Sequence, residues 1–155
     1  MEFKGTQKIM APRQTVWQSL NDPAMLQACV PGCTAFTASG ADEFQAVVVA
    51  SVGPVKATFK GNLTLSERIE ATSYRIVGKG EGGIAGFGKM TAFVSLEDDG
   101  DATLLTYVSN AEVGGKLAQI GSRLVSSVAN KLADEFFKRF NDNVSALAGN
   151  GANAA

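Results

Sequence analysis

The sequence predicts an α+β fold in which a curved antiparallel sheet wraps around one long C-terminal helix. Several segments alternate apolar and polar residues with a period of two, which is typical of strands with one buried face. Two short helical segments follow the first of these strands, and residues 115–147 repeat apolar side chains at steps of three and four. An apolar sheet face and an amphipathic helix bury one another, so we expect the sheet to pack against that helix.

The N-terminal part predicts one strand and then two short helices. Residues 2–9 carry charged or polar side chains at every second position, as a strand with one wet face does. Pro12 suits the first turn of a short helix, and Asp22 followed by Pro23 is a typical start for a second one. Pro31-Gly32 then predicts a turn.

From residue 34 onward the period is two, which predicts five or six further antiparallel strands and a sheet of six to seven strands in all. The alternation is clearest over residues 55–65, where apolar or small residues are set against lysine, threonine and asparagine. Asp99-Gly100 predicts a hairpin turn. The other expected strands cover residues 44–52, 74–82, 88–97 and 103–113.

The C-terminal part predicts one amphipathic helix over residues 115–147, which completes a helix-grip arrangement. Gly121 lies inside it at a cost of about 1 kcal/mol relative to Ala, so we expect a ligand or strand to approach the helix closely there. Residues 148–155 are small and polar, and we expect them to form a disordered tail. Residues 1–147 are then a single domain.

Composition excludes several classes of protein. The formal net charge is -1, and no stripe of lysine and arginine is present to track phosphates, so nucleic acid is not an expected partner. The opening residues lack the apolar region of a signal peptide, and no apolar run approaches the roughly 20 residues that span a bilayer, so we expect a cytoplasmic protein. Cys29 and Cys33 match neither a zinc nor a redox spacing and are expected to be reduced thiols.

The motifs that carry catalysis argue against an enzyme. The chain has no histidine, which removes the commonest general base and metal ligand. The glycine patterns over residues 78–83 and 83–89 resemble phosphate loops, but no helix follows either of them. Three aspartates at the predicted hairpin are expected to be solvated turn residues: Asp98, Asp99 and Asp101. An enzyme would require Tyr107 or Glu112 to titrate near neutral pH.

The most informative pattern is a strand without side chains on one face. Gly78, Gly80 and Gly82 occupy every second position of the strand expected over residues 74–82. An empty volume inside a domain forfeits packing contacts, so the pattern predicts a cavity that an apolar small molecule fills. The alternative is that bulky neighbours fill the same space, and the candidates are Trp17, Phe136 and Phe140.

A set of short segments also carries a family resemblance. They are Ala11-Pro12-Arg13, Val16-Trp17, Asn21-Asp22-Pro23, Cys29-Val30-Pro31-Gly32-Cys33 and the stretches 53–61, 78–89 and 113–124. Over roughly residues 2–141 the chain resembles the carbon monoxide dehydrogenase G-subunit family, a branch of the START/Bet v 1-like (SRPBCC) superfamily of lipid-binding domains.

The resemblance implies a non-catalytic accessory protein of a molybdenum hydroxylase such as CO dehydrogenase. Such a protein binds a lipophilic ligand, a quinone, in a hydrophobic cavity and links the enzyme to the membrane quinone pool. It implies no covalent cofactor and no metal, and a peripheral place at the cytoplasmic face of the inner membrane. Two alternatives stay open: a recruitment or assembly factor that acts through its surface, and a generic lipid-binding module.

The expected cavity residues share the inner face of the sheet or the apolar stripe of the helix. Tyr107 and Ser109 are suited to hydrogen-bond a quinone carbonyl, Phe59 and Phe87 to stack on its ring. Phe87 is out of phase with its neighbours, so we expect it at the cavity mouth as a gate. The other candidates are Leu63, Ile76, Gly78, Gly80, Met90, Ala92, Val94, Leu105, Leu117, Ile120, Gly121 and Leu124.

The cations of the C-terminal helix have two interpretations. They contact a membrane surface or the partner enzyme, or they are simply solvated, because Asp134 and Glu135 are interleaved with them. The residues concerned are Lys116, Arg123, Lys131, Lys138 and Arg139.

Overall fold

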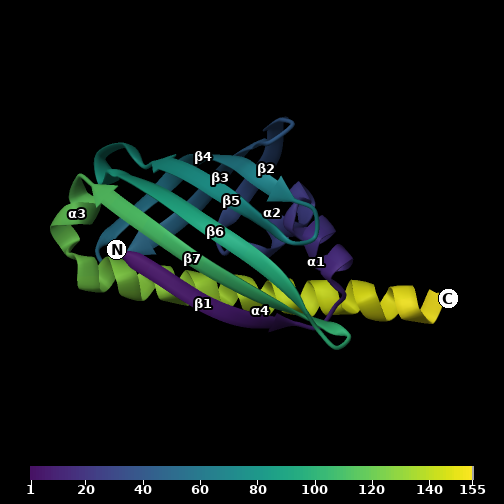
Figure 1. Ribbon diagram of the computed structural model, residues 1–155. Helices are drawn as coiled ribbons and strands as arrows, with labels where there is room; N and C mark the ends of the chain where they lie inside the picture. Colours follow the sequence, from purple (N-terminus) through teal and green to yellow (C-terminus); the bar gives the residue numbers. More distant parts are fainter. Residues whose placement is uncertain (155) are drawn as a thin grey trace.

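The computed structural model describes the backbone of residues 1–154 and the side chains of residues 1–149, and its sheet curves around one long helix (Figure 1). Strand β1 (Glu2–Ile9) leads into helices α1 (Arg13–Leu20) and α2 (Pro23–Cys29). Six strands follow: β2 (Cys33–Gly40), β3 (Glu43–Val52), β4 (Val55–Ile69), β5 (Ser73–Glu81), β6 (Phe87–Asp99) and β7 (Ala102–Gly114). The remaining elements are the short 3-10 helix η1 (Gly83–Ala85), α3 (Lys116–Ile120) and α4 (Ser122–Ala154).

The sheet has seven antiparallel strands in the order β1-β7-β6-β5-β4-β3-β2. Consecutive strands from β2 to β7 pair through short turns, and β1 returns to pair with β7 along its whole length. The predicted α+β helix-grip fold is therefore confirmed, with the two short helices after the first strand where the sequence places them.

The C-terminal helix differs from the prediction, because Gly121 divides it into α3 and α4. The φ of Gly121 is +104°, in the left-handed region that side chains disfavour. A Cβ atom built there would meet nothing within 4 Å. Neither a strand nor a neighbouring side chain approaches Gly121, so the expected close approach of a strand is wrong. The glycine is present because the backbone turns between two helices at this point.

Helix α4 also runs through most of the segment that was expected to be a tail, residues 148–155. It is helical as far as Ala154, and residue 155 lies outside the described residues. Figure 1 shows this end of α4 extending beyond the sheet.

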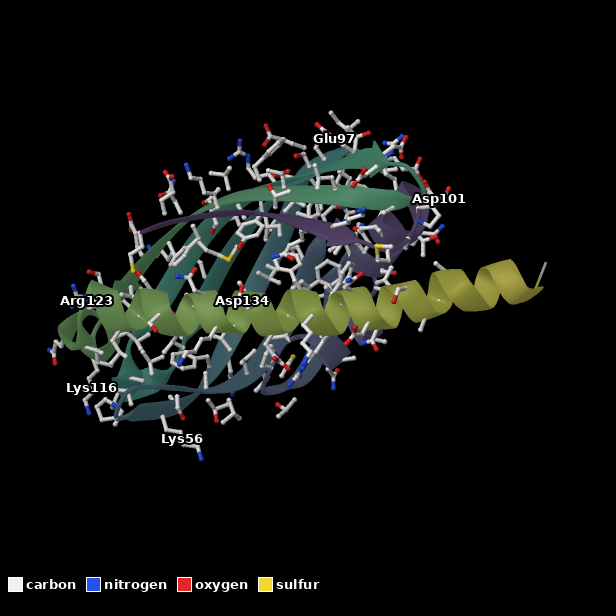
Figure 2. All side chains as sticks on the ribbon, turned by 90° about the horizontal axis from the view of Figure 1, so that it is seen from below. Lys56, Glu97, Asp101, Lys116, Arg123 and Asp134 are labelled. Atoms are coloured by element: carbon white, nitrogen blue, oxygen red, sulfur yellow. The ribbon has the colours of Figure 1, made fainter. Side chains whose placement is uncertain are left out.

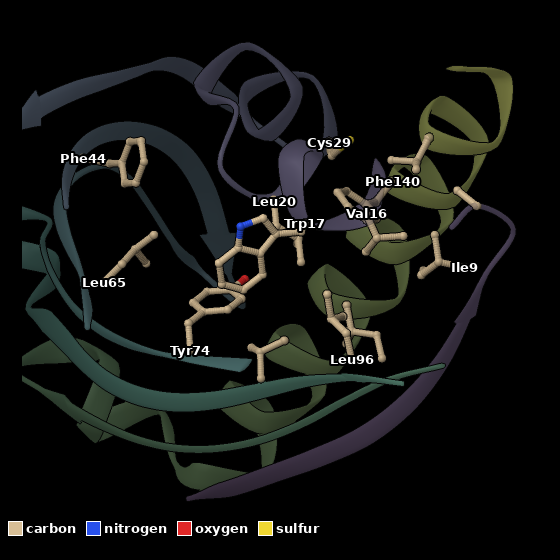
Figure 3. Close-up of a cluster of buried hydrophobic side chains, with 14 of the residues drawn as sticks. Ile9, Val16, Trp17, Leu20, Cys29, Phe44, Leu65, Tyr74, Leu96 and Phe140 are labelled. Carbon is tan, nitrogen blue, oxygen red and sulfur yellow. The ribbon is translucent and has the colours of Figure 1, made fainter. Parts of the chain in front are cut away.

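The hydrophobic core occupies one end of the molecule, where α1, α2 and the C-terminal half of α4 cover the sheet (Figure 3). The Trp17 and Tyr74 rings meet edge to face with centroids 5.5 Å apart. Phe140 and Val144 of α4 are completely buried, as is Val16 of α1. Aromatic edge-to-face pairs and full burial of large apolar side chains make this end the main source of stability.

Tyr74 makes the stability depend on pH in the alkaline range. Burial raises the pKa of Tyr74 above its ordinary value of 10.0. Above pH 10 the unfolded chain therefore loses a proton that the folded chain keeps, so the free energy of unfolding falls as the pH rises. Tyr74→Phe keeps the ring and removes the titration, and we expect a shallower fall between about pH 10 and 11. Urea unfolding followed by Trp17 fluorescence measures both slopes, and equal slopes would contradict this assignment.

Candidate ligand-binding cavity

A strip of bare backbone crosses the inner face of the sheet. Gly80 of β5 pairs with Gly61 of β4 on one side and with Gly88 of β6 on the other. Ala46 of β3 pairs with Gly61 and extends the row to a fourth strand. At about 4.8 Å between strands, this glycine strip (Gly61, Gly80, Gly88 and Ala46) spans ~14 Å. The open space therefore runs across the strands and not along β5.

Neighbouring side chains fill the space at the other two glycines of the pattern, Gly78 in β5 and Gly82 just after it. A Cβ atom at Gly78 would lie 2.9 Å from Cδ2 of Leu63 and 3.1 Å from Cγ of Met90. At Gly82 it would lie 2.5 Å from the Phe59 ring. At Gly80 the nearest of these atoms is the Lys60 carbonyl oxygen at 4.0 Å. Bulky neighbours thus fill two of the three positions, although they are not the aromatic residues named as candidates.

A cavity of about 370 Å³ lies over the glycine strip. This volume falls within the range of small-molecule sites, roughly 300–1,000 Å³. Lys79, Lys89 and Glu112 border it through their backbone, because alternation turns their side chains to the outer face. The side chains that line it are apolar: Val30, Phe36, Ala46, Val48, Phe59, Leu63, Met90, Ala111 and Val113. The cavity therefore suits an uncharged, apolar ligand.

Five of the residues expected from the sequence line this cavity, namely Phe59, Leu63, Gly78, Gly80 and Met90. Six more share the inner face but lie in successive rows towards the core. The first row beyond Met90 contains Ile76, Ala92 and Ser109, the second contains Val94 and Tyr107, and the third contains Leu105. Val94 and Leu105 are buried in the core cluster, so the core and the cavity divide one sheet face between them.

The helical residues expected at the site lie elsewhere. Leu117 is buried and Ile120 half-buried in α3, and neither is among the residues that line the cavity. Leu124 packs its Cδ2 atom against Gly53 in the β3–β4 turn. Gly121 faces open space. The sequence pattern misplaced these residues because the chain changes direction at Gly121, which the apolar spacing does not reveal.

Phe87 is not at the cavity. It shares the outer face with Lys89, whose Nζ atom lies 5.8 Å from the centroid of the Phe87 ring. The ring lies against Gly114 of the neighbouring strand β7. Phe87 therefore does not lie at the cavity mouth, where it was expected to act as a gate.

Tyr107 presents a neutral hydroxyl inside the molecule. Its ring stacks on Phe137 of α4 with centroids 5.4 Å apart, and its hydroxyl end lies over Gly5 of β1. Burial, and secondarily the charge of Asp134, raises the pKa of Tyr107. Because Tyr107 lies two rows and Ser109 one row from Met90, they can reach only a ligand that extends from the cavity towards the core.

Sequence analysis did not identify the cavity residues whose position depends on which strands pair. Gly61, Gly88, Ala46 and Ala111 are small and inward, but only the cross-strand register places them in one patch with Gly80. The signal that could have found them is alternation, which assigns each to the inner face.

The described residues were also compared with the requirements of a metal site, a disulfide and a membrane-spanning helix. No cluster of three or more His, Cys, Asp or Glu side chains that could hold a metal occurs among the described residues. Cys29 and Cys33 are free, as expected, and burial raises the pKa of both thiols. Within residues 1–154, no helix combines the length and the apolar character needed to cross a membrane.

Comparison with known proteins decides the family. The family model for CoxG, the G-subunit of carbon monoxide dehydrogenase, matches residues 5–145. The chain belongs to the CoxG family. A search of curated proteins gave no match.

Solved structures similar to this CoxG-family chain share its START-like fold. A conserved protein from Geobacillus kaustophilus has a TM-score of 0.88 at 29% identity, covering 94% of this chain and 96% of its own. A START superfamily protein from Mycobacterium smegmatis has a TM-score of 0.72 at 16% identity, with 94% and 98% covered. The Zhui aromatase/cyclase from Streptomyces sp. R1128 has a TM-score of 0.64 at 12% identity, with 93% of each chain covered. The last two show the fold alone, and one of them is an enzyme, so the fold does not decide whether this chain is catalytic.

Proposed function

We propose that this protein is a non-catalytic accessory protein of a molybdenum hydroxylase such as carbon monoxide dehydrogenase. In this proposal it binds a quinone in the cavity over the glycine strip and connects the enzyme with the quinone pool of the membrane. Membership of the CoxG family supports the link to the dehydrogenase. The observation that supports quinone binding is the apolar cavity of about 370 Å³, whose floor is backbone without side chains.

The shape of the floor favours a flat ring. Without side chains at Gly61, Gly80 and Gly88, a planar ligand can lie directly against the peptide groups. Phe59 borders the strip on one side and the Leu63–Met90 row on the other, which encloses the ring edges with apolar groups. A neutral quinone ring meets these requirements. A charged ligand does not, because the charged residues that border the cavity turn their side chains away from it and leave such a ligand unpaired.

Three features support a role without catalysis. The chain has no histidine, and Glu112, one of the two residues on which an enzyme would depend, belongs to the outer face. The other, Tyr107, has a raised pKa and is therefore not poised to exchange a proton near neutral pH. Redox chemistry then belongs to the quinone and to the partner enzyme.

Native mass spectrometry of the protein incubated with a short-chain ubiquinone or menaquinone tests the carrier function. We expect a bound mass of one quinone, and we expect none with a charged analogue of the same ring. Protein that stays empty but still captures the dehydrogenase would contradict the carrier function and identify a recruitment or assembly factor. Uptake of fatty acids and quinones alike would instead identify a generic lipid-binding module.

A further inference from the structure

The turns at the two ends of the sheet differ in charge. Turns β3–β4 and β5–β6 and the β7–α3 connection lie at one end, because consecutive strands are antiparallel. Contacts join them: the backbone of Gly86 lies against Gly114 and Gly115, and Leu124 lies against Gly53. We call segments 53–56, 82–86 and 114–124 the basic end. They contain Lys56, Lys116 and Arg123 and no carboxylate.

The opposite end is acidic. Turns β2–β3, β4–β5 and β6–β7, with the strand ends beside them, carry eight carboxylates: Asp42, Glu43, Glu67, Glu70, Glu97, Asp98, Asp99 and Asp101. Lys8, Arg13, Arg68 and Arg75 pair with four of them, so this end keeps a smaller excess of negative charge. Figure 2 shows Glu97 and Asp101 at one end of the molecule and Lys56, Lys116 and Arg123 at the other. A chain with a net charge of -1 therefore has a charge asymmetry along its length, which orients it in front of a charged surface.

The three cations of the basic end are available to a partner. All three are exposed, and none takes part in an ion pair within the described residues. The carboxylates closest in the sequence, Glu81 and Glu112, stand opposite Lys60 and Lys89 in the strand register and belong to the outer face. In contrast, Arg139 of α4 is engaged with Glu135 at 3.0 Å.

An apolar side chain projects from the same end. Ile84 is 85% exposed at the tip of the β5–β6 loop, between Gly83 and Gly86, which both have positive φ. Leu124 is also exposed, at the start of α4. A projecting apolar tip surrounded by lysine and arginine is the composition of surfaces that bind the interface of an anionic bilayer.

We propose that the basic end docks on an anionic bilayer, with Ile84 in the acyl boundary and Lys56, Lys116 and Arg123 against lipid phosphates. The loop that carries Ile84 follows directly on β5, two residues from Gly80. Docking therefore brings the glycine strip close to the lipid, so that a ligand enters without crossing water. That consequence rests on the proposed function, whereas the docking itself does not.

Flotation with quinone-free vesicles of phosphatidylcholine, with and without phosphatidylglycerol, tests the docking. We expect binding only to the anionic vesicles, weakened by salt. Lys56→Gln/Lys116→Gln/Arg123→Gln should lower the partition coefficient about a hundredfold. Lys4→Gln/Lys131→Gln/Lys138→Gln removes the same charge from exposed positions elsewhere and should keep most of the binding.

A test variant and a matched control variant probe the contribution of Ile84. Ile84→Ser should lower the partition coefficient about tenfold. Ile69→Ser changes a residue that is 60% exposed near the acidic end and should have no effect. Gly80→Leu should float like the wild type, so failure of ligand uptake does not affect this result.

Three outcomes would overturn the docking surface. They are wild-type protein that does not float, equal flotation with both vesicle types, and equal losses in the two triple variants. If the basic-end variant instead loses capture by the dehydrogenase while the wild type ignores vesicles, this end binds a protein and not a bilayer.

Discussion

Replacement of Gly80 by leucine is expected to abolish quinone uptake and to leave the free energy of unfolding within about 1 kcal/mol of the wild type. A Cβ atom at this position comes no closer than 4.0 Å to the atoms around it, so the new side chain extends into the cavity over the glycine strip. Loss of a glycine from a strand interior also favours the folded state. Native mass spectrometry measures uptake, and urea unfolding followed by Trp17 fluorescence measures stability.

Two substitutions on the same strand control this result. Lys79→Leu introduces the same side chain one residue away, on the outer face, and should leave uptake unchanged. Gly78→Leu drives a side chain into Leu63 and Met90, and we expect it to lower stability by about 1–3 kcal/mol. Normal uptake by Gly80→Leu would show that the strip is not the floor of the binding site.

The fold could be predicted because its signals are local. Residues 55–65 alternate so regularly that this strand, and the face that it buries, follows from the sequence alone. The break at Gly121 could not be predicted, because Leu117, Ile120 and Leu124 keep helical spacing across it. The sequence does not distinguish a glycine tolerated within a helix from a glycine that ends one. Only the positive φ of Gly121 shows that the helix is interrupted there.

The site could be predicted only in part because its position depends on register. Alternation correctly assigned Met90, Ala92, Val94 and Leu105 to the inner face, but it contains no information on which rows the helices cover. Met90 lines the cavity, whereas Leu105, in a row further along, is buried in the core. The bare strip similarly became visible only when pairing joined Gly80 to Gly61 and Gly88.

The division of one sheet face into core and cavity predicts unequal sensitivity along α4. Phe140 is 0% exposed and stacks on Phe136 with centroids 5.6 Å apart. Phe140→Ala should therefore lower the free energy of unfolding by roughly 3–5 kcal/mol, a large part of the stability of a single domain. Leu132, two turns earlier on the same helix, is 37% exposed, and Leu132→Ala should cost less than about 1 kcal/mol.

Urea unfolding of the two variants measures the difference, with the wild type and Leu147→Ala, another exposed leucine of α4, as references. A small effect at Leu132 would show that this part of α4 contributes less to the stability of the fold than the part that carries Phe140. Equal, large losses at Leu132 and Phe140 would mean that packing is continuous along α4. In that case no space would remain for a ligand between the helix and the sheet.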